Sequence, residues 1–244
     1  MTKNTPIYLD YNATTPVDPR VFEAMKDWFL IPSNAGSRTH DYGKNAKEAV
    51  ETARGQVAEV VGAKPEEIYF TSGATESNNI AILGLEKLGN ELNRKHIIST
   101  SIEHKAVLEP LKEMKRRGFE VELAPVTSGG FVEIETIKNL LRPDTLLVSV
   151  MHANNETGIL QPIVEIAELV SSTDAFLHTD AAQTFGKEIG ELREAKCDFI
   201  SISGHKIYGP QGVGALFVRR VSGKKRPLEP IAFGGGQELS LIHI

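Results

Sequence analysis

The sequence predicts an α/β fold, in which a mainly parallel sheet is covered by helices on both faces. Short apolar runs alternate along the chain with longer stretches whose apolar residues recur at helical spacing. The run 146–153 is apolar at successive positions, which is typical of a strand that is buried on both faces of a parallel sheet. No internal repeat, low-complexity segment or linker interrupts this pattern.

Five helices are expected from the spacing of apolar residues. The first follows Pro19, a residue that suits the first turn of a helix. Gly62 and Gly118 stand where the second and fourth helices should end, because glycine adopts the left-handed cap conformation without strain. The expected helices cover 21–30, 44–62, 75–89, 104–118 and 162–171.

Seven strands are expected between these helices and after them. They cover 68–73, 96–100, 119–126, 146–153, 175–180, 197–203 and 212–220. Ligands of parallel sheets bind at the carboxyl ends of the strands. Residues directly after each strand are therefore the first candidates for function.

The composition argues against several classes of protein. The 244 residues carry a net charge of −5 without a basic stripe, so binding of nucleic acid has little electrostatic support. No apolar stretch is long enough to cross a bilayer, and the first residues do not form a secretory signal. The single cysteine, Cys197, excludes an internal disulfide and a cysteine-rich metal site and fits a reducing compartment. We expect a cytoplasmic protein.

The strand 68–73 runs through small residues directly into a helix. Such a turn presents backbone N–H groups at a helix N-terminus, where the helix dipole favours an anion. Gly73, Ala74 and Thr75 are therefore candidates for binding a phosphate group. An ordinary N-cap is the alternative interpretation, because Ser and Thr are common at that position.

Polar residues also follow the next strands of the predicted sheet. His104 follows the strand 96–100, where a histidine is more often a cap or a surface residue. Asn154 and Asn155 follow 146–153, as turn formers or as amide donors to a ligand. Asp180 ends 175–180, and because a buried carboxylate is costly without a partner, it requires a protein donor or a cationic ligand. The alternative for Asp180 is the N-cap of the following turn.

The strand 197–203 delivers a lysine within a run of small residues. Ser203, His205 and Lys206 follow one another closely there, and Gln183 stands three residues after Asp180. These residue types suit pyridoxal phosphate, whose aldehyde takes a lysine as a Schiff base and whose ring nitrogen takes an acid that keeps it protonated. Asp180 and Lys206 lie at the ends of successive strands, which would place them on opposite sides of one ring.

Six stretches of the chain together resemble the NifS/IscS-type cysteine desulfurases. These are fold-type I pyridoxal-phosphate enzymes of the class V aminotransferase superfamily, and the resemblance runs from about residue 5 to about residue 238. The stretches are YLDYNATTPVDP (8–19), YFTSGATESNN (69–79), EHKAVL (103–108), MHANNETG (151–158), HTDAAQTFGK (178–187) and SGHKIYGPQGVGAL (203–216).

The resemblance implies a role for each candidate residue. Lys206 would carry the cofactor, and His104 would lie over the cofactor ring and move protons. Asp180 would pair with the ring nitrogen and Gln183 with the phenolic oxygen, while Asn155 would lie near that oxygen and the substrate carboxylate. The residues implied to hold the phosphate are Gly73, Ala74, Thr75, Ser203 and His205.

The resemblance also implies a reaction and partners. The enzyme would convert L-cysteine to L-alanine and pass the sulfur, held as a persulfide on a protein cysteine, to an acceptor protein. The acceptor would be an iron–sulfur scaffold or a tRNA-thiolation protein, and the enzyme would be a homodimer with a cofactor site shared between subunits.

The chain departs from the family pattern in its C-terminal part. The family's persulfide cysteine lies on a loop well after the lysine, whereas Cys197 begins the strand before it and is expected to be a small buried hydrophobic residue. We expect an N-terminal segment (1–15), a cofactor-binding large domain (16–238) and a non-native tail (239–244), with the small domain largely missing. Such a chain is expected to bind the cofactor weakly and to turn over little cysteine.

Two alternatives stay open at this point. The first is another class V enzyme that shares the lysine, the acid and the phosphate site, such as a selenocysteine lyase. The second is a scaffold that keeps the fold and binds sulfur-transfer partners without catalysis.

Overall fold

A single seven-stranded sheet forms the centre of the computed structural model, which describes residues 6–220 and 227–234. The strand order is β1-β7-β6-β5-β4-β2-β3. Strand β7 pairs antiparallel with β1 and β6, and the other pairs are parallel. The predicted mainly parallel sheet is therefore confirmed. The strands are β1 (Ile68–Thr71), β2 (His96–Thr100), β3 (Glu120–Ala124), β4 (Thr145–Ser149), β5 (Phe176–Asp180), β6 (Phe199–Ser203) and β7 (Gly214–Val218).

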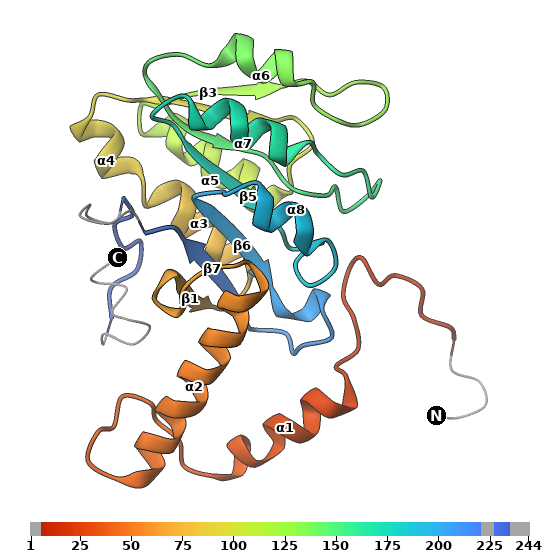
Figure 1. Cartoon of the computed structure of the whole chain (residues 1–244), viewed down its shortest axis with the longest axis vertical. Coiled ribbons are helices and arrows are strands. Elements are labelled where there is room, and N and C mark those ends of the chain that lie inside the picture. Colours follow the sequence, from red (N-terminus) through yellow and green to blue (C-terminus); the bar gives the residue numbers. More distant parts are fainter. Residues whose placement is uncertain (1–5, 221–226, 235–244) are drawn as a thin grey trace.

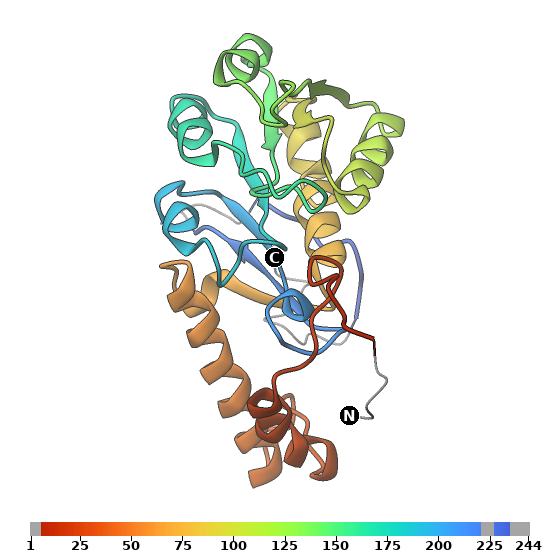
Figure 2. The same ribbon diagram turned by 90° about the vertical axis from the view of Figure 1, so that its right-hand side faces the viewer.

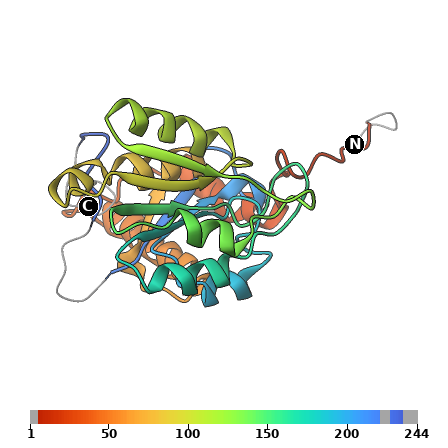
Figure 3. The same cartoon turned by 90° about the horizontal axis from the view of Figure 1, so that it is seen from above.

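Helices cover both faces of this sheet, as Figures 1 and 3 show. One layer holds α3, α4 and α5, and the other holds α6, α7 and α8, with the C-terminal half of α2 on the same side (Figure 2). The helices are α1 (Pro19–Leu30), α2 (Asp41–Val60), α3 (Ala74–Leu83), α4 (Glu86–Glu91), α5 (Lys105–Arg116), α6 (Ile134–Leu140), α7 (Ile163–Ser171) and α8 (Ile189–Glu194).

The strands divide their apolar side chains between two cores, because successive residues of a strand point to opposite faces. In β2, Ile97 packs against α3 and α5, whereas Ile98 belongs to the core beneath α6, α7 and α8. Phe199 and Ile200 of β6 alternate in the same way. Both faces of the sheet are therefore buried, which explains the continuous apolar runs of the sequence.

The helix boundaries follow local signals in most cases. Asp18 accepts a hydrogen bond from the backbone N–H of Arg20 (2.8 Å) and so caps α1, which begins at Pro19 as expected. Gly62 and Gly118 have φ values of 66° and 88° and lie just beyond α2 and α5. Both predicted helix ends are confirmed.

One predicted helix is wrong as a single element. The stretch 75–89 forms α3 and part of α4, with a break at Gly84 and Leu85. A Cβ atom on Gly84 would lie 3.0 Å from the carbonyl oxygen of Glu229, whose backbone N–H donates to the Gly84 carbonyl (2.9 Å). This long-range contact ends α3. The short helices α6 and α8 were not predicted either, and β4 ends at Ser149, short of the predicted 153.

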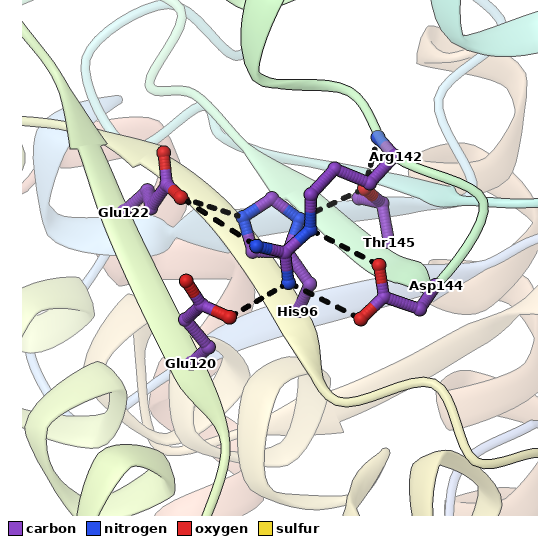
Figure 4. A network of polar contacts seen from close by, with 6 residues as sticks. All are labelled: His96, Glu120, Glu122, Arg142, Asp144 and Thr145. Atoms are coloured by element: carbon purple, nitrogen blue, oxygen red, sulfur yellow. Dashed lines mark hydrogen bonds and ion pairs between the residues drawn. The ribbon is translucent and has the colours of Figure 1, made fainter.

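A network of charges fastens the edge strand β3 to the sheet (Figure 4). Arg142 donates to Glu120 of β3 (2.8 Å) and to Asp144 (3.0 Å), and it lies 3.7 Å from Glu122. His96 of β2 approaches Glu122 at 3.7 Å, and burial lowers the pKa of this histidine. The network lies at the amino ends of the strands, away from the edge at which function was predicted.

No helix in residues 6–220 and 227–234 is both long and apolar enough to cross a membrane. Within the same residues no group of His, Cys, Asp and Glu side chains could hold a metal ion. The predicted tail 239–244 lies outside the described residues.

Two glycines allow the turn after β1 to pack against β7. Gly73 has a φ of 151°, which side chains rarely permit. A Cβ atom on Gly214 would lie 2.6 Å from the Cα of Gly73 and 2.4 Å from the carbonyl oxygen of Ile202. The contact holds the turn that begins α3 against Gly214, the first residue of β7.

Substitution Gly214→Ala should therefore destabilise the protein. Overpacking against fixed backbone costs about 1–3 kcal/mol of unfolding free energy. Denaturant unfolding measures this loss. Gly190→Ala is the matched control, because no heavy atom lies within 4 Å of its added Cβ and the residue lies in α8. Equal unfolding free energies of the two variants would contradict the close packing of Gly214 against Gly73.

Candidate active site

A pocket of about 630 Å³ opens at the carboxyl ends of the parallel strands. Turns after β1, β2, β4, β5 and β6 form its walls, together with the N-terminal segment around Asn12. All ten residues predicted from the sequence line this pocket: Gly73, Ala74, Thr75, His104, Asn155, Asp180, Gln183, Ser203, His205 and Lys206.

Asp180 is the buried acid of the pocket, with 6% of its surface exposed. Its Oδ1 accepts the backbone N–H of Ala182 (2.9 Å) and its Oδ2 accepts the side-chain amide of Asn78 (2.8 Å). Burial raises the pKa of Asp180, while these two hydrogen bonds and the charge of Lys206 oppose the rise. The cap interpretation is half right, since the aspartate caps the next turn and also faces the pocket.

Lys206 lies on the turn that follows β6, the neighbour of β5 in the sheet. Its Nζ donates to the carbonyl oxygen of Asn12, close to the bond from Gln183 Nε2 to the same oxygen (2.9 Å). Burial lowers the pKa of Lys206, and the Asp180 carboxylate works against this effect. The amine is therefore easier to deprotonate than that of a surface lysine.

The N-terminal segment is bound to the lysine turn by several hydrogen bonds. The backbone N–H and the hydroxyl of Thr15 both donate to the His205 carbonyl (2.9 Å each). His205 Nδ1 contacts the hydroxyl of Thr14 (3.0 Å), and burial lowers the pKa of the imidazole. In Figure 1 this segment runs along the side toward which β6 points. The contribution of Asn12 was missed in the sequence, because it depends on contacts between opposite ends of the chain.

The turn after β1 supplies backbone donors to the pocket. Gly73 is the N-cap of α3 without a side-chain cap, and Ala74 and Thr75 begin the helix. The Glu76 carboxylate accepts the Ser72 backbone N–H (2.6 Å). Helix α3 therefore begins with residues that line the pocket together with Ser203 and His205, and the first N–H groups of a helix have no partner within the helix.

His104 stands at the N-terminus of α5, and its Nδ1 accepts the backbone N–H of Ala106 (3.0 Å). An accepting Nδ1 leaves the imidazole proton on Nε2. His104 is both the cap that one interpretation predicted and a pocket residue. Its Nε2 is free to exchange a proton at the pocket.

Of the polar residues that follow β4, some stabilise the turn or the core and one lines the pocket. Asn154 Oδ1 accepts the backbone N–H groups of Glu156 (3.0 Å) and Thr157 (2.9 Å), which makes Asn154 a turn former. His152 is fully buried between Thr184 and Glu191 (2.8 Å each) and does not line the pocket. Asn155 is the amide that reaches the pocket.

A family model described as Aminotransferase class-V matches residues 7–243. The chain belongs to the aminotransferase class-V family. The sheet with helices on both faces therefore corresponds to the large domain expected from the sequence. The named relatives of the chain, which follow, confirm the predicted resemblance to cysteine desulfurases.

The curated relatives of this class-V chain include several cysteine desulfurases. It is 49% identical over 243 residues to "Cysteine desulfurase, mitochondrial" of Arthroderma benhamiae, covering 98% of this chain and 47% of the relative. It is 48% identical over 238 residues to "Cysteine desulfurase IscS" of Rickettsia prowazekii, covering 96% and 56%. The chain thus spans about half the length of the curated relatives it matches.

Two solved structures are similar to this chain in sequence and in fold. DndA from Streptomyces lividans is 54% identical with a TM-score of 0.87, covering 96% of this chain and 66% of that one. The structure titled "SspA in complex with cysteine" is 40% identical with a TM-score of 0.91, covering 97% and 67%.

Cys197 has the buried position predicted for it. The thiol is fully inaccessible in the core beneath α7 and α8, two residues before β6. Burial raises its pKa to about 12. Because the thiolate is the reactive form of cysteine, Cys197 cannot serve as a sulfur nucleophile in this class-V fold.

The Cys197 thiol should be almost inert toward a thiol reagent in the native protein. We expect its reaction at pH 8 to be at least about 100-fold slower than in the unfolded chain, because a pKa near 12 leaves little thiolate. Absorbance of the released chromophore measures both rates. A native rate close to the unfolded rate would show that the thiol is accessible.

Proposed function

We propose that this chain is the cofactor-binding part of a pyridoxal-phosphate-dependent cysteine desulfurase. One observation carries the proposal: Asp180 and Lys206, at the ends of neighbouring parallel strands, face a single pocket. Support comes from the relatives that bear the name cysteine desulfurase and from the similar structure whose title includes cysteine.

The donor set of the pocket fits pyridoxal phosphate. A buried carboxylate whose pKa is raised by desolvation is stabilised by a cation beside it, and a protonated ring nitrogen is such a cation. Helix α3 offers N–H groups to a phosphate, and the close approach of Gly73 to Gly214 leaves no room for a larger side chain there. When bound, the cofactor supplies an electron sink for substrate electrons.

The residues of this chain would then have separate tasks. Asp180, oriented by Asn78, would hold the ring nitrogen protonated. Gln183 would donate to the phenolic oxygen, and Asn155 would orient that oxygen and the substrate carboxylate. Gly73, Ala74, Thr75, Ser203 and His205 would bind the phosphate.

Two residues would move protons. Lys206 would bond covalently to the cofactor at rest and take the substrate Cα proton when released, which its lowered pKa favours. His104 would exchange a proton through Nε2 during sulfur release, because its Nδ1 is held by Ala106.

The partners belong to the same proposal. L-Cysteine would be the substrate, and the sulfur would pass through a cysteine other than Cys197 to an acceptor protein for iron–sulfur assembly or tRNA thiolation. The homodimer remains a prediction. The cytoplasmic location also remains a prediction, because the relatives include fungal proteins named mitochondrial.

Reductive trapping tests the role of Lys206. Protein mixed with pyridoxal phosphate and treated with borohydride should carry a pyridoxyl group on Lys206, identified by peptide mass spectrometry. Lys206→Ala should abolish the labelled peptide and the cofactor absorbance band. Lys105→Ala, at the exposed start of α5, is the control and should label normally. Labelling of another lysine in place of Lys206 would refute the assignment.

Substitution Asp180→Asn should lower the desulfuration rate of the full-length protein about 100-fold, since a neutral amide does not keep the ring nitrogen protonated. Release of alanine from L-cysteine measures the rate. Asp27→Asn on the exposed face of α1 is the control. An Asp180→Asn variant with the wild-type rate would contradict the proposed role of the acid.

A further inference from the structure

Glu103 is a buried carboxyl group beside the pocket that none of the proposed roles uses. It lies between the end of β2 and His104, and only 5% of its surface is exposed. Carboxylate side chains are rarely buried without a partner, because they lose their hydration.

The contacts of Glu103 join the ends of two neighbouring strands. Its Oε1 accepts the hydroxyl of Thr100 at the end of β2 (2.7 Å) and the backbone N–H of Met151, which follows β4 (2.9 Å). A third bond reinforces the junction, since Asn154 Nδ2 donates to the carbonyl of Ile102 (3.0 Å). The turn that leads to His104 is therefore fastened to the segment after β4.

This junction decides where His104 stands. The imidazole is fixed to the start of α5 by the bond from Ala106, so its place over the pocket follows the backbone of the preceding turn. Met151 itself lines the pocket. Loss of the Glu103 bonds would leave only the bond from Asn154 to the Ile102 carbonyl to hold the turn on the β2 side against the pocket wall on the β4 side.

The surroundings of the second oxygen of Glu103, Oε2, disfavour a negative charge on this side chain. Oε2 is buried and has no hydrogen-bond partner in the part of the chain that the structure describes. Burial raises the pKa of Glu103 to about 8, and the carboxylate of Asp180 on β5 adds to the rise. Because Oε1 already accepts two hydrogen bonds, a proton on this group would lie on Oε2, and the raised pKa favours that neutral form.

We propose that Glu103 is a positioning residue that sets His104 over the pocket by joining the end of β2 to the segment after β4. The inference rests on the proposed function, in which His104 moves a proton.

Ionisation of Glu103 has a definite sign in stability. Between the ordinary pKa of 4.5 and the folded value of about 8, the folded protein holds a proton that the unfolded chain has released. Stability from this group is therefore largest below pH 4.5 and falls as pH rises toward 8. Glu103→Gln, which keeps an acceptor at Oε1 and stays neutral, should lack this fall.

The test compares Glu103→Gln and Glu103→Ala in the full-length protein loaded with pyridoxal phosphate. Glu103→Ala should keep the cofactor absorbance but lose about 100-fold in kcat, a loss that misplacement of one group by an ångström can produce. Glu103→Gln should keep kcat within about three-fold, and its unfolding free energy should lack the fall between pH 5 and 8 that Glu103 gives the wild type. Glu109→Ala, an exposed glutamate on α5, is the control.

A spectroscopic readout separates positioning from catalysis. Nitrogen-15 NMR of labelled histidine should show one sharp set of His104 ring signals in the wild type and in Glu103→Gln, and shifted or exchange-broadened signals in Glu103→Ala, because the ring follows the turn that Glu103 no longer holds. Unchanged His104 signals and an unchanged kcat in Glu103→Ala would overturn the inference. A Glu103→Gln variant whose stability falls between pH 5 and 8 as in the wild type would overturn it as well, even if Glu103→Ala fails to fold. If the wild type binds the cofactor but releases no alanine, the proposed function fails, and the comparison of His104 signals still decides the role of Glu103.

Discussion

The pairing of β5 with β6 is the constraint on which the site depends. Asp180 lies opposite Ser201, and the backbone N–H of Ala181 donates to the Ser201 carbonyl (3.0 Å). Parallel neighbours end at the same edge, so this register brings the acid at the end of β5 to the turn that carries Lys206. A slip by one residue would reverse the face of every side chain on the strand and turn the acid away from the pocket. The apolar residues buried on both faces of the sheet hold the register in place.

The pocket combines buried polar groups that are costly without a ligand. Asp180 has two hydrogen bonds, yet its desolvation is incompletely compensated, and Asn78 Oδ1 has no partner among the described residues. Burial raises the pKa of Glu103 to about 8, which disfavours a second buried charge beside Asp180. In the proposed function, the ring of the cofactor would place a cation at the acid, and its phosphate would place an anion at the start of α3.

Local patterns in the sequence predicted most of the sheet, and the ten residues expected to form the site all line one pocket. Such a prediction is possible because the ends of parallel strands meet at one edge of the sheet, so that position along the chain implies position in space. Two failures have a common cause in distant contacts. The break at Gly84 depends on Glu229, and the place of Asn12 depends on Lys206 and Gln183. The short helix α8 was missed for a different reason, because it has too few turns to show a clear apolar period.

A crystal structure of the protein with pyridoxal phosphate tests the central claim most directly. The account predicts that Lys206 Nζ is bonded to the aldehyde carbon while a carboxylate oxygen of Asp180 lies within hydrogen-bond distance of the ring nitrogen of the same molecule. A cofactor bound elsewhere, or one that contacts only one of these two residues, would contradict it.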